Sequence, residues 1–257
     1  MDPKTFRLLT YNILDGGLGR EAAITSVIAA AEPDVVMLPE VTRVEVLAQM
    51  AQDLAMEYRI AGGGDRARKV GVLSKWPIWR MNTARPGWAL RHLITVTVQL
   101  PGGRKISIGG VHLMAFYLWL FEKWREAELK SMLKYIQQVE PELDLLAGDF
   151  NAVVPGDGAS FDECPGWVKA QVVFSRNKPP AFALNTVLDA GYVDCFRKAN
   201  PQADGFTLPA SNPDIRLDYV FARRSFAESL KRCEVVTAPE AVKTASDHLP
   251  VLAEFDL

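Results

Sequence analysis

Polar side chains capable of proton transfer or cation binding follow several short apolar segments of this chain. In residues 145–151 an apolar run ends at a glycine, and Asp149 and Asn151 come directly after it. Strand side chains alternate between two faces, so these two residues point the same way if the strand geometry continues. Asp149 can accept a proton and Asn151 can donate a hydrogen bond. The segment therefore predicts chemistry at the tip of a buried strand.

The same organisation recurs elsewhere in the chain. Other predicted strands end in Asn12, Glu40, His112 and Asp218, and the pair Asp247 and His248 precedes the last strand. Only three histidines are present, and two of them lie in these segments. Each residue has a structural explanation when taken singly, since an asparagine can satisfy a turn and a glutamate can cap a helix. A shared site is a hypothesis that explains all of them.

Taken in order, these segments resemble the endonuclease/exonuclease/phosphatase superfamily. The motifs are T-Y-N, P-D-V-V-x-L-x-E, G-V-L-S, V-H-L, G-D-F-N, L-D-Y-V and S-D-H-x-P-V, between residues 6 and 255. The resemblance implies an α/β (α+β) fold, a four-layered sandwich of two packed mixed sheets flanked by helices. We expect one domain over residues 1–257. The resemblance also implies hydrolysis of a phosphate ester at a divalent-metal site.

The resemblance assigns an expected role to each residue. Glu40 is the first choice of ligand for Mg²⁺ or Mn²⁺, because a hard cation prefers oxygen donors. Asn12 and Asp247 are further ligands or partners of ligands. Asp149 resembles the aspartate that activates the attacking water, and Asn151 the neighbour that donates to a phosphate oxygen.

The histidines complete the expected site. His248 is expected to donate to a phosphate oxygen while Asp218 holds its ring, since a carboxylate on the far nitrogen fixes orientation. His112 resembles the histidine of the DNase I, 5-phosphatase and sphingomyelinase branches, where the exonuclease III branch has tyrosine. One departure stands out: the family usually has glutamine before the metal-binding glutamate, and this chain has Pro39. Proline offers no such side-chain hydrogen bond, which puts the support of Glu40 in doubt.

Substrate-binding residues are less well defined by the sequence. Five aromatic residues lie within residues 116–124, directly after the segment of His112. They could bind an apolar substrate group or a membrane interface, or form the face by which a helix packs on a sheet. Trp119 is a candidate substrate contact on this basis, and Trp167, in the later long loop, is a candidate for the facing wall of the same site. Arg91 is a candidate phosphate contact, with a surface ion pair as the alternative.

Periodicity and turn residues predict the elements that position these side chains. Strands are expected at residues 5–14, 35–38, 70–74, 93–100, 105–111, 143–147, 217–222, 233–238 and 251–255, and helices at 20–31, 44–56, 122–139 and 182–190. Residues 62–65 form a Gly-rich turn, and residues 153–180 are expected to be a long functional loop.

Composition narrows the function without fixing the substrate. A net charge of −2 and the absence of a basic surplus disfavour a non-specific DNA binder. Three widely spaced cysteines, no signal peptide and no membrane-spanning run suggest a cytoplasmic protein. A phosphodiesterase for small or lipid-linked esters is the first hypothesis, and a DNA or RNA nuclease is the alternative. A non-catalytic binding module is disfavoured because Asp149, Asn151 and His248 are all present. No obligate protein partner is evident.

Overall fold

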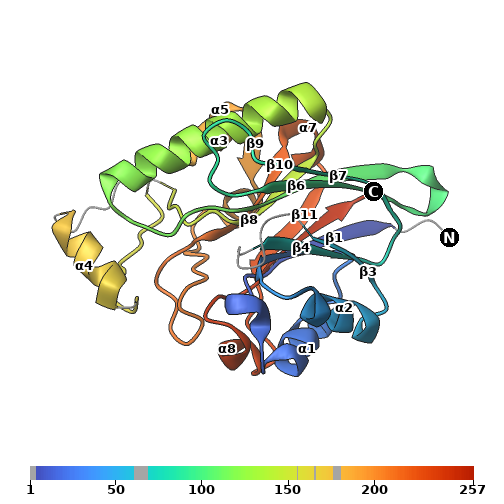
Figure 1. The fold of residues 1–257 in the computed structure, drawn as a ribbon, viewed down its shortest axis with the longest axis horizontal. Helices are drawn as coiled ribbons and strands as arrows, with labels where there is room; N and C mark the ends of the chain where they lie inside the picture. Colours follow the sequence, from blue (N-terminus) through green and yellow to red (C-terminus); the bar gives the residue numbers. More distant parts are fainter. Residues whose placement is uncertain (1–3, 61–68, 155, 165, 176–180) are drawn as a thin grey trace.

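Two six-stranded mixed sheets face each other in the computed structural model, which describes residues 4–60, 69–154, 156–164, 166–175 and 181–257 (Figure 1). The first sheet has the order β11 (Leu230–Val235), β12 (Val251–Asp256), β1 (Thr5–Thr10), β2 (Val35–Val41), β4 (Lys69–Ser74) and β3 (Glu57–Ile60). The second has the order β5 (Ile78–Ala84), β6 (Leu93–Gln99), β7 (Lys105–His112), β8 (Leu145–Asp149), β10 (Asp218–Arg223) and β9 (Tyr192–Asp194).

Helices cover the outer face of each sheet. The first sheet is covered by α1 (Glu21–Ala31), α2 (Val44–Asp53) and α8 (Val242–Ala245), and the second by α3 (Trp119–Val139) and α5 (Asn185–Asp189) (Figure 1). Short helices α6 (Cys195–Ala199) and α7 (Arg224–Ala227) flank the strands, α4 (Gly166–Phe174) projects from the body, and two 3₁₀ turns span Asp15–Gly17 and Pro101–Gly103. The predicted four-layered sandwich is confirmed.

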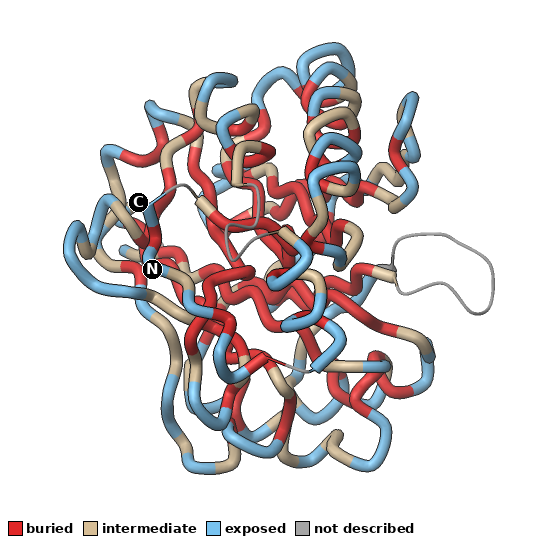
Figure 2. Tube along the Cα trace, turned by 90° about the vertical axis from the view of Figure 1, so that its left-hand side faces the viewer, coloured by how far each residue is buried: buried red, intermediate tan, exposed pale blue. Residues whose placement is uncertain are grey.

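Successive apolar side chains along a strand point to opposite faces of its sheet, and this produces three apolar layers. In β1, Phe6 and Leu8 pack between the sheets, whereas Leu9 packs beneath the helices of the first sheet. Leu146 of β8 packs beneath α3, while Leu145 faces the other sheet. Buried residues therefore run through the middle of the molecule, and exposed residues lie on the helices and loops (Figure 2).

Several elements differ from the sequence prediction. Residues 166–174, expected within a long loop, form α4, and the edge strands β3, β5 and β9 were not predicted. The long helix starts at Trp119 rather than at residue 122, so the aromatic stretch is half loop and half helix. The predicted turn at 62–65 lies outside the described residues. The three cysteines are free and buried. Among the described residues, no helix combines the length and apolar character needed to cross a bilayer.

Candidate active site

Three site residues lie side by side across the second sheet because of its strand register. His112 at the end of β7 pairs with Asp149 at the end of parallel β8, and Asp149 pairs with Asp218 at the start of antiparallel β10. Side chains at paired positions lie on the same face of a sheet. The register therefore gathers a histidine and two carboxylates, all buried, at one sheet edge.

The first sheet brings Asn12 and Glu40 to the same place. Asn12 follows the end of β1, and Glu40 lies in an irregular part of β2 between Leu38 and Val41. Glu40 has a φ of 69°, a left-handed conformation that is costly for a residue with a side chain. Such strain persists where the surrounding structure determines it, and it is frequent at functional sites.

Residues of both sheets share one buried polar cluster. The Nδ2 atom of Asn12 donates to Asp149 Oδ2 at 2.9 Å and to Glu40 Oε1 at 3.3 Å. His112 Nε2 lies 3.6 Å from Glu40 Oε1 and 3.7 Å from Asp149 Oδ2. Asn12 and His112 thus connect two carboxylates that would otherwise repel each other.

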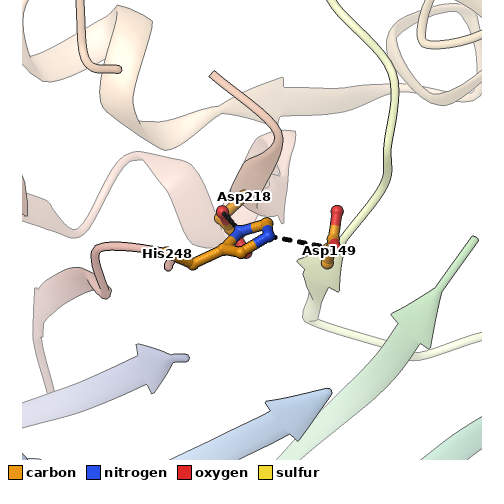
Figure 3. Close-up of side chains that lie close together, drawn as sticks. All are labelled: Asp149, Asp218 and His248. Atoms are coloured by element: carbon orange, nitrogen blue, oxygen red, sulfur yellow. Dashed lines mark hydrogen bonds and ion pairs between the residues drawn. The ribbon is translucent and has the colours of Figure 1, made fainter. Parts of the chain in front are cut away.

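His248 lies between the two aspartates, as Figure 3 shows. Its Nδ1 atom is 2.7 Å from Asp218 Oδ2, and its Nε2 atom is 4.0 Å from Asp149 Oδ2. Burial alone would lower the pKa of His248, but the adjacent Asp218 carboxylate outweighs burial, and the pKa is raised to about 10. The ring is therefore cationic near neutral pH, with Nδ1–H held by Asp218 and Nε2–H directed to the space beside Asp149.

Asp149 is the most constrained member of the cluster. Its Oδ1 accepts the backbone N–H of Asn151 at 2.8 Å, and its Oδ2 accepts from the side-chain Nδ2 of Asn151 at 3.0 Å. Burial raises the pKa of Asp149 to about 7, and the negative charge of Asp218 adds to the rise, while His248 opposes it. A carboxylate that titrates near neutral pH is well matched to a general base.

Oxygen donors in the cluster fit a hard divalent cation. Glu40 and Asp149 place two carboxylates within reach of the same Asn12 amide, and carboxylate and amide oxygens are the ligands that Mg²⁺ and Mn²⁺ accept. Asp149, Asp218 and His248 also bring potential ligand atoms within 4.8 Å of one another. In that set, however, Asp218 and His248 already hydrogen-bond each other. We therefore favour Glu40, rather than this triad, as the centre of a metal site.

Backbone groups compensate for the proline before Glu40. Asp15 N donates to Glu40 Oε2 at 2.9 Å, while Asn12 contacts Oε1. The carbonyl oxygen of Pro39 accepts the N–H of Ile13 at 3.3 Å, which ties the two strand ends together. The glutamate is thus held by the loop after β1, through Asp15 N and the Asn12 side chain, although Pro39 offers no side-chain hydrogen bond.

Two hydroxyl groups support the site and were not predicted. Thr207 Oγ1 donates to Asp218 Oδ2 at 2.7 Å, on the same oxygen that binds His248. Ser246 Oγ donates to the backbone oxygen of Asn12 at 2.7 Å and lies 3.4 Å from Asp247 Oδ1. Ser246 belongs to the S-D-H-x-P-V segment and could have been found there, whereas no sequence pattern marks Thr207. Asp247 itself is half-buried, and Ser246 Oγ lies between its Oδ1 and the backbone oxygen of Asn12.

The three expected substrate contacts lie outside this cluster. Arg91 precedes β6, and its backbone N–H donates to Glu128 at 2.8 Å. Trp119 begins α3 and is 61% exposed, and Trp167 on α4 packs edge-on against Phe116. Within the described part of the chain, none of their hydrogen bonds, ion pairs or ring contacts reaches Asp149 or His248.

Comparison with known proteins places the chain in a family. The profile of the Endonuclease/Exonuclease/phosphatase family matches residues 9–248, so the chain belongs to this family of phosphate-ester hydrolases. The comparison with curated protein sequences gave no match.

Solved structures share the fold over nearly all of the chain. A family member from Beutenbergia cavernae DSM 12333 superposes with a TM-score of 0.75 at 23% identity, covering 99% of this chain and 72% of the other. A 3'-5' exonuclease from Neisseria meningitidis gives 0.76 at 20% identity, covering 98% and 100%. An AP endonuclease from Archaeoglobus fulgidus gives 0.76 at 18% identity, with the same coverage.

Proposed function

We propose that the protein is a divalent-metal-dependent phosphodiesterase in which Asp149 activates the attacking water. The observation that carries this proposal is the meeting of a buried carboxylate with a pKa of about 7, a cationic His248 and the Asn12–Glu40 pair at one place between the sheets. These groups match the parts of an in-line displacement at phosphorus: a base, a donor to the phosphate and a cation site.

Each residue contributes to the same displacement. Asp149 accepts a proton from water as the water oxygen bonds to phosphorus. The bond from phosphorus to the ester oxygen breaks at the same time, and the ester oxygen leaves with the electron pair and takes a proton from solvent to become the alcohol. His248 Nε2–H donates to a phosphoryl oxygen as negative charge builds up there, and Asn151 Nδ2–H does the same by exchanging its bond to Leu113 O for the phosphate. Asp218 keeps the imidazole oriented. A Mg²⁺ or Mn²⁺ ion held by Glu40, with Asn12 and Asp247 beside it, would supply charge neutralisation at the phosphate.

An apolar surface formed by residues 116–124 and α4 supports a small or lipid-linked substrate. This surface consists of Phe116, Trp119, Leu120, Trp124, Trp167, Val173 and Phe174, contributed by residues 116–124 and α4. Leu120 is 64% exposed and Phe174 is 81% exposed. Aliphatic side chains have no aromatic face on which bases can stack, whereas a lipid interface accepts aliphatic and aromatic groups alike. Packing of the aromatic stretch on the sheet, one of the three alternatives from the sequence, is disfavoured, because only Tyr117 of its aromatic residues is buried.

Nuclease activity is the second candidate function. Two of the similar structures are a 3'-5' exonuclease and an AP endonuclease, and both are under 25% identical to this chain. Exposed Trp119 and Trp167 offer rings on which unpaired bases could stack. The catalytic cluster could hydrolyse the phosphate ester of either substrate. The two candidate functions therefore differ in the alcohol that leaves the phosphate, and the surface that binds this alcohol decides between them.

A substrate panel tests the proposal. The protein would be assayed with Mg²⁺ or Mn²⁺ on bis-p-nitrophenyl phosphate, p-nitrophenyl phosphate, sphingomyelin vesicles and plasmid DNA, with chelator and an Asp149→Asn variant as controls. We expect metal-dependent hydrolysis of a small or lipid-linked diester. Rapid plasmid nicking without turnover of the small esters would establish the nuclease alternative. No hydrolysis of any ester would indicate a non-catalytic binding module.

A further inference from the structure

Tyr117 connects the apolar surface to the candidate active site. It lies in the loop between His112 and α3, and it is only 4% exposed although its neighbours on both sides reach the surface. Its ring packs edge-on against Phe161, with centroids 5.5 Å apart. Its hydroxyl group lies 3.4 Å from Oδ1 of Asn151, the residue expected to donate to phosphate.

The direction of this hydrogen bond follows from the environment of the phenol. Burial raises the pKa of Tyr117 well above its ordinary value, and Asp149 raises it further, so the hydroxyl keeps its proton and donates. Asn151 must accept through Oδ1, which leaves Nδ2 to donate to Leu113 O at 3.1 Å and to Asp149 Oδ2 at 3.0 Å. Three contacts thus fix which way the amide faces.

Tyr117 is itself held from several sides. Its backbone N–H donates to Gln171 Oε1 on α4 at 2.9 Å, and its carbonyl oxygen accepts from Ser175 Oγ at 3.4 Å. Arg125, buried on α3, donates to the carbonyl oxygens of Met114 and Phe116 on either side. The position of the phenol hydroxyl is therefore tied to α3 and α4, which carry most of the apolar surface.

We propose that Tyr117 is a positioning residue that keeps the Asn151 amide turned with Nδ2 toward Asp149, where one N–H can exchange its bond to Leu113 O for a phosphoryl oxygen. Through its backbone contact with Gln171, Tyr117 also links this placement to α4. The inference rests on the proposed function, because it assigns Asn151 a contact with substrate. The Tyr117 hydroxyl touches no reacting atom and acts through Asn151 alone. The distance of 3.4 Å from the Tyr117 hydroxyl to Asn151 Oδ1 is long for an O–H···O hydrogen bond. We therefore expect a moderate effect on turnover when this hydroxyl is removed.

A double-mutant cycle tests this link. Tyr117→Phe keeps the ring and removes the hydroxyl, and we expect kcat on the preferred ester to fall about 3- to 20-fold with KM changed less than twofold, as for a weakened donor to the transition state. In an Asn151→Ala background the same substitution should have no further effect. Equal losses in both backgrounds would overturn the proposal. Tyr192→Phe is the matched control, because it removes the buried bond from Tyr192 to Leu143 O, far from Asn151.

A second measurement separates this inference from the proposed function. The side-chain NH₂ signals of Asn151, assigned by their loss in Asn151→Ala, would be followed by NMR in the substrate-free protein. Tyr117→Phe should shift these signals and speed their exchange with solvent, and Tyr192→Phe should not. Unchanged signals would overturn the inference whether or not the protein hydrolyses an ester. Changed signals in a protein without esterase activity would support the link while refuting the function.

Discussion

The Nδ1 atom of His248 lies 2.7 Å from Oδ2 of Asp218, a carboxylate that also accepts from Thr207 at 2.7 Å. This buried pair sets the charge of the imidazole, because a neighbouring carboxylate stabilises the protonated ring. It also sets its direction, leaving Nε2 on the side of Asp149. The pair has consequences for both stability and activity.

The first prediction concerns the pH dependence of stability. The pKa of His248 is about 10 in the folded protein and its ordinary value is 6.5, so the protonated ring favours folding. This contribution is fully present below about pH 6.5 and is lost as the pH rises toward 10. Asp218→Asn should make the free energy of unfolding decline less between pH 6.5 and 10, as measured by urea unfolding. Asp256→Asn, at the exposed end of β12, is the control. A decline as steep as in the unmodified protein would contradict the assignment.

Removing the proposed base or the phosphate donor should reduce turnover. We expect Asp149→Asn and His248→Ala each to lower kcat by at least ~10²-fold, as for lost acid–base or electrostatic groups. Steady-state kinetics on the ester found by the panel would measure this, with Asp189→Asn on the exposed end of α5 as the control. Near-normal kcat in either active-site variant would refute its role.

Glu40 should act chiefly through metal affinity. Glu40→Gln keeps the shape of the side chain but removes its charge. We expect the metal to bind at least ~10-fold more weakly, because loss of a residue that only hydrogen-bonds a metal ligand already reduces metal affinity by about that factor. Titration of activity with Mg²⁺ or Mn²⁺, together with calorimetry of Mn²⁺ binding, would show the shift. Glu45→Gln, exposed in the first turn of α2, serves as the comparison. An unchanged titration would count against Glu40 as a ligand.

The sequence predicted the parts of the fold that follow a simple period. Strands such as residues 145–149 could be found because buried apolar runs end abruptly in glycine or polar residues. In contrast, β5 has an exposed face that includes Trp79 and Met81, so its pattern does not resemble a core strand. Helix α4 buries only Val168 and Val172, too few apolar positions to mark a helix within a segment rich in glycine and proline.

Site residues were predictable where they end a strand, and supporting residues were not. The ladder that pairs His112, Asp149 and Asp218 follows from strand order, which no single segment encodes. Thr207 reaches Asp218 from a separate loop, and Tyr117 reaches Asn151 across 34 positions of sequence. Such contacts depend on how the loops pack. A threonine or tyrosine in the sequence does not indicate which distant side chain its hydroxyl group will contact.

Gly148 should be intolerant of any side chain. Its φ of +145° is rarely adopted by other residues, and a Cβ atom there would lie 2.0 Å from the carbonyl oxygen of Val111 on the neighbouring strand. Gly148→Ala should therefore destabilise the protein by about 3 kcal/mol or more, since backbone must move to relieve the collision. Denaturant unfolding would measure the loss. Gly166→Ala, where a Cβ meets nothing within 4 Å, should have little effect. Comparable stability of the two variants would contradict the described strand pairing.

The buried pair of Glu122 and Arg125 should be one of the strongest determinants of stability near the apolar surface. Both side chains are almost fully buried, with Arg125 Nη2 2.7 Å from Glu122 Oε2, and Glu122 Oε1 accepts the backbone N–H groups of residues 182 and 183. Arg125→Met leaves the glutamate charge buried without its partner, which should cost about 3–5 kcal/mol of unfolding free energy.

A matched surface pair separates charge burial from the loss of any ion pair. Lys130→Met removes the exposed contact with Glu126 on the same helix and should cost less than about 1 kcal/mol. Adding Glu122→Gln to Arg125→Met should restore part of the stability, because the uncompensated charge is then gone. Equal losses for Arg125→Met and Lys130→Met in urea unfolding would show that the buried pair does not hold residues 114–116 and 182–183 against α3.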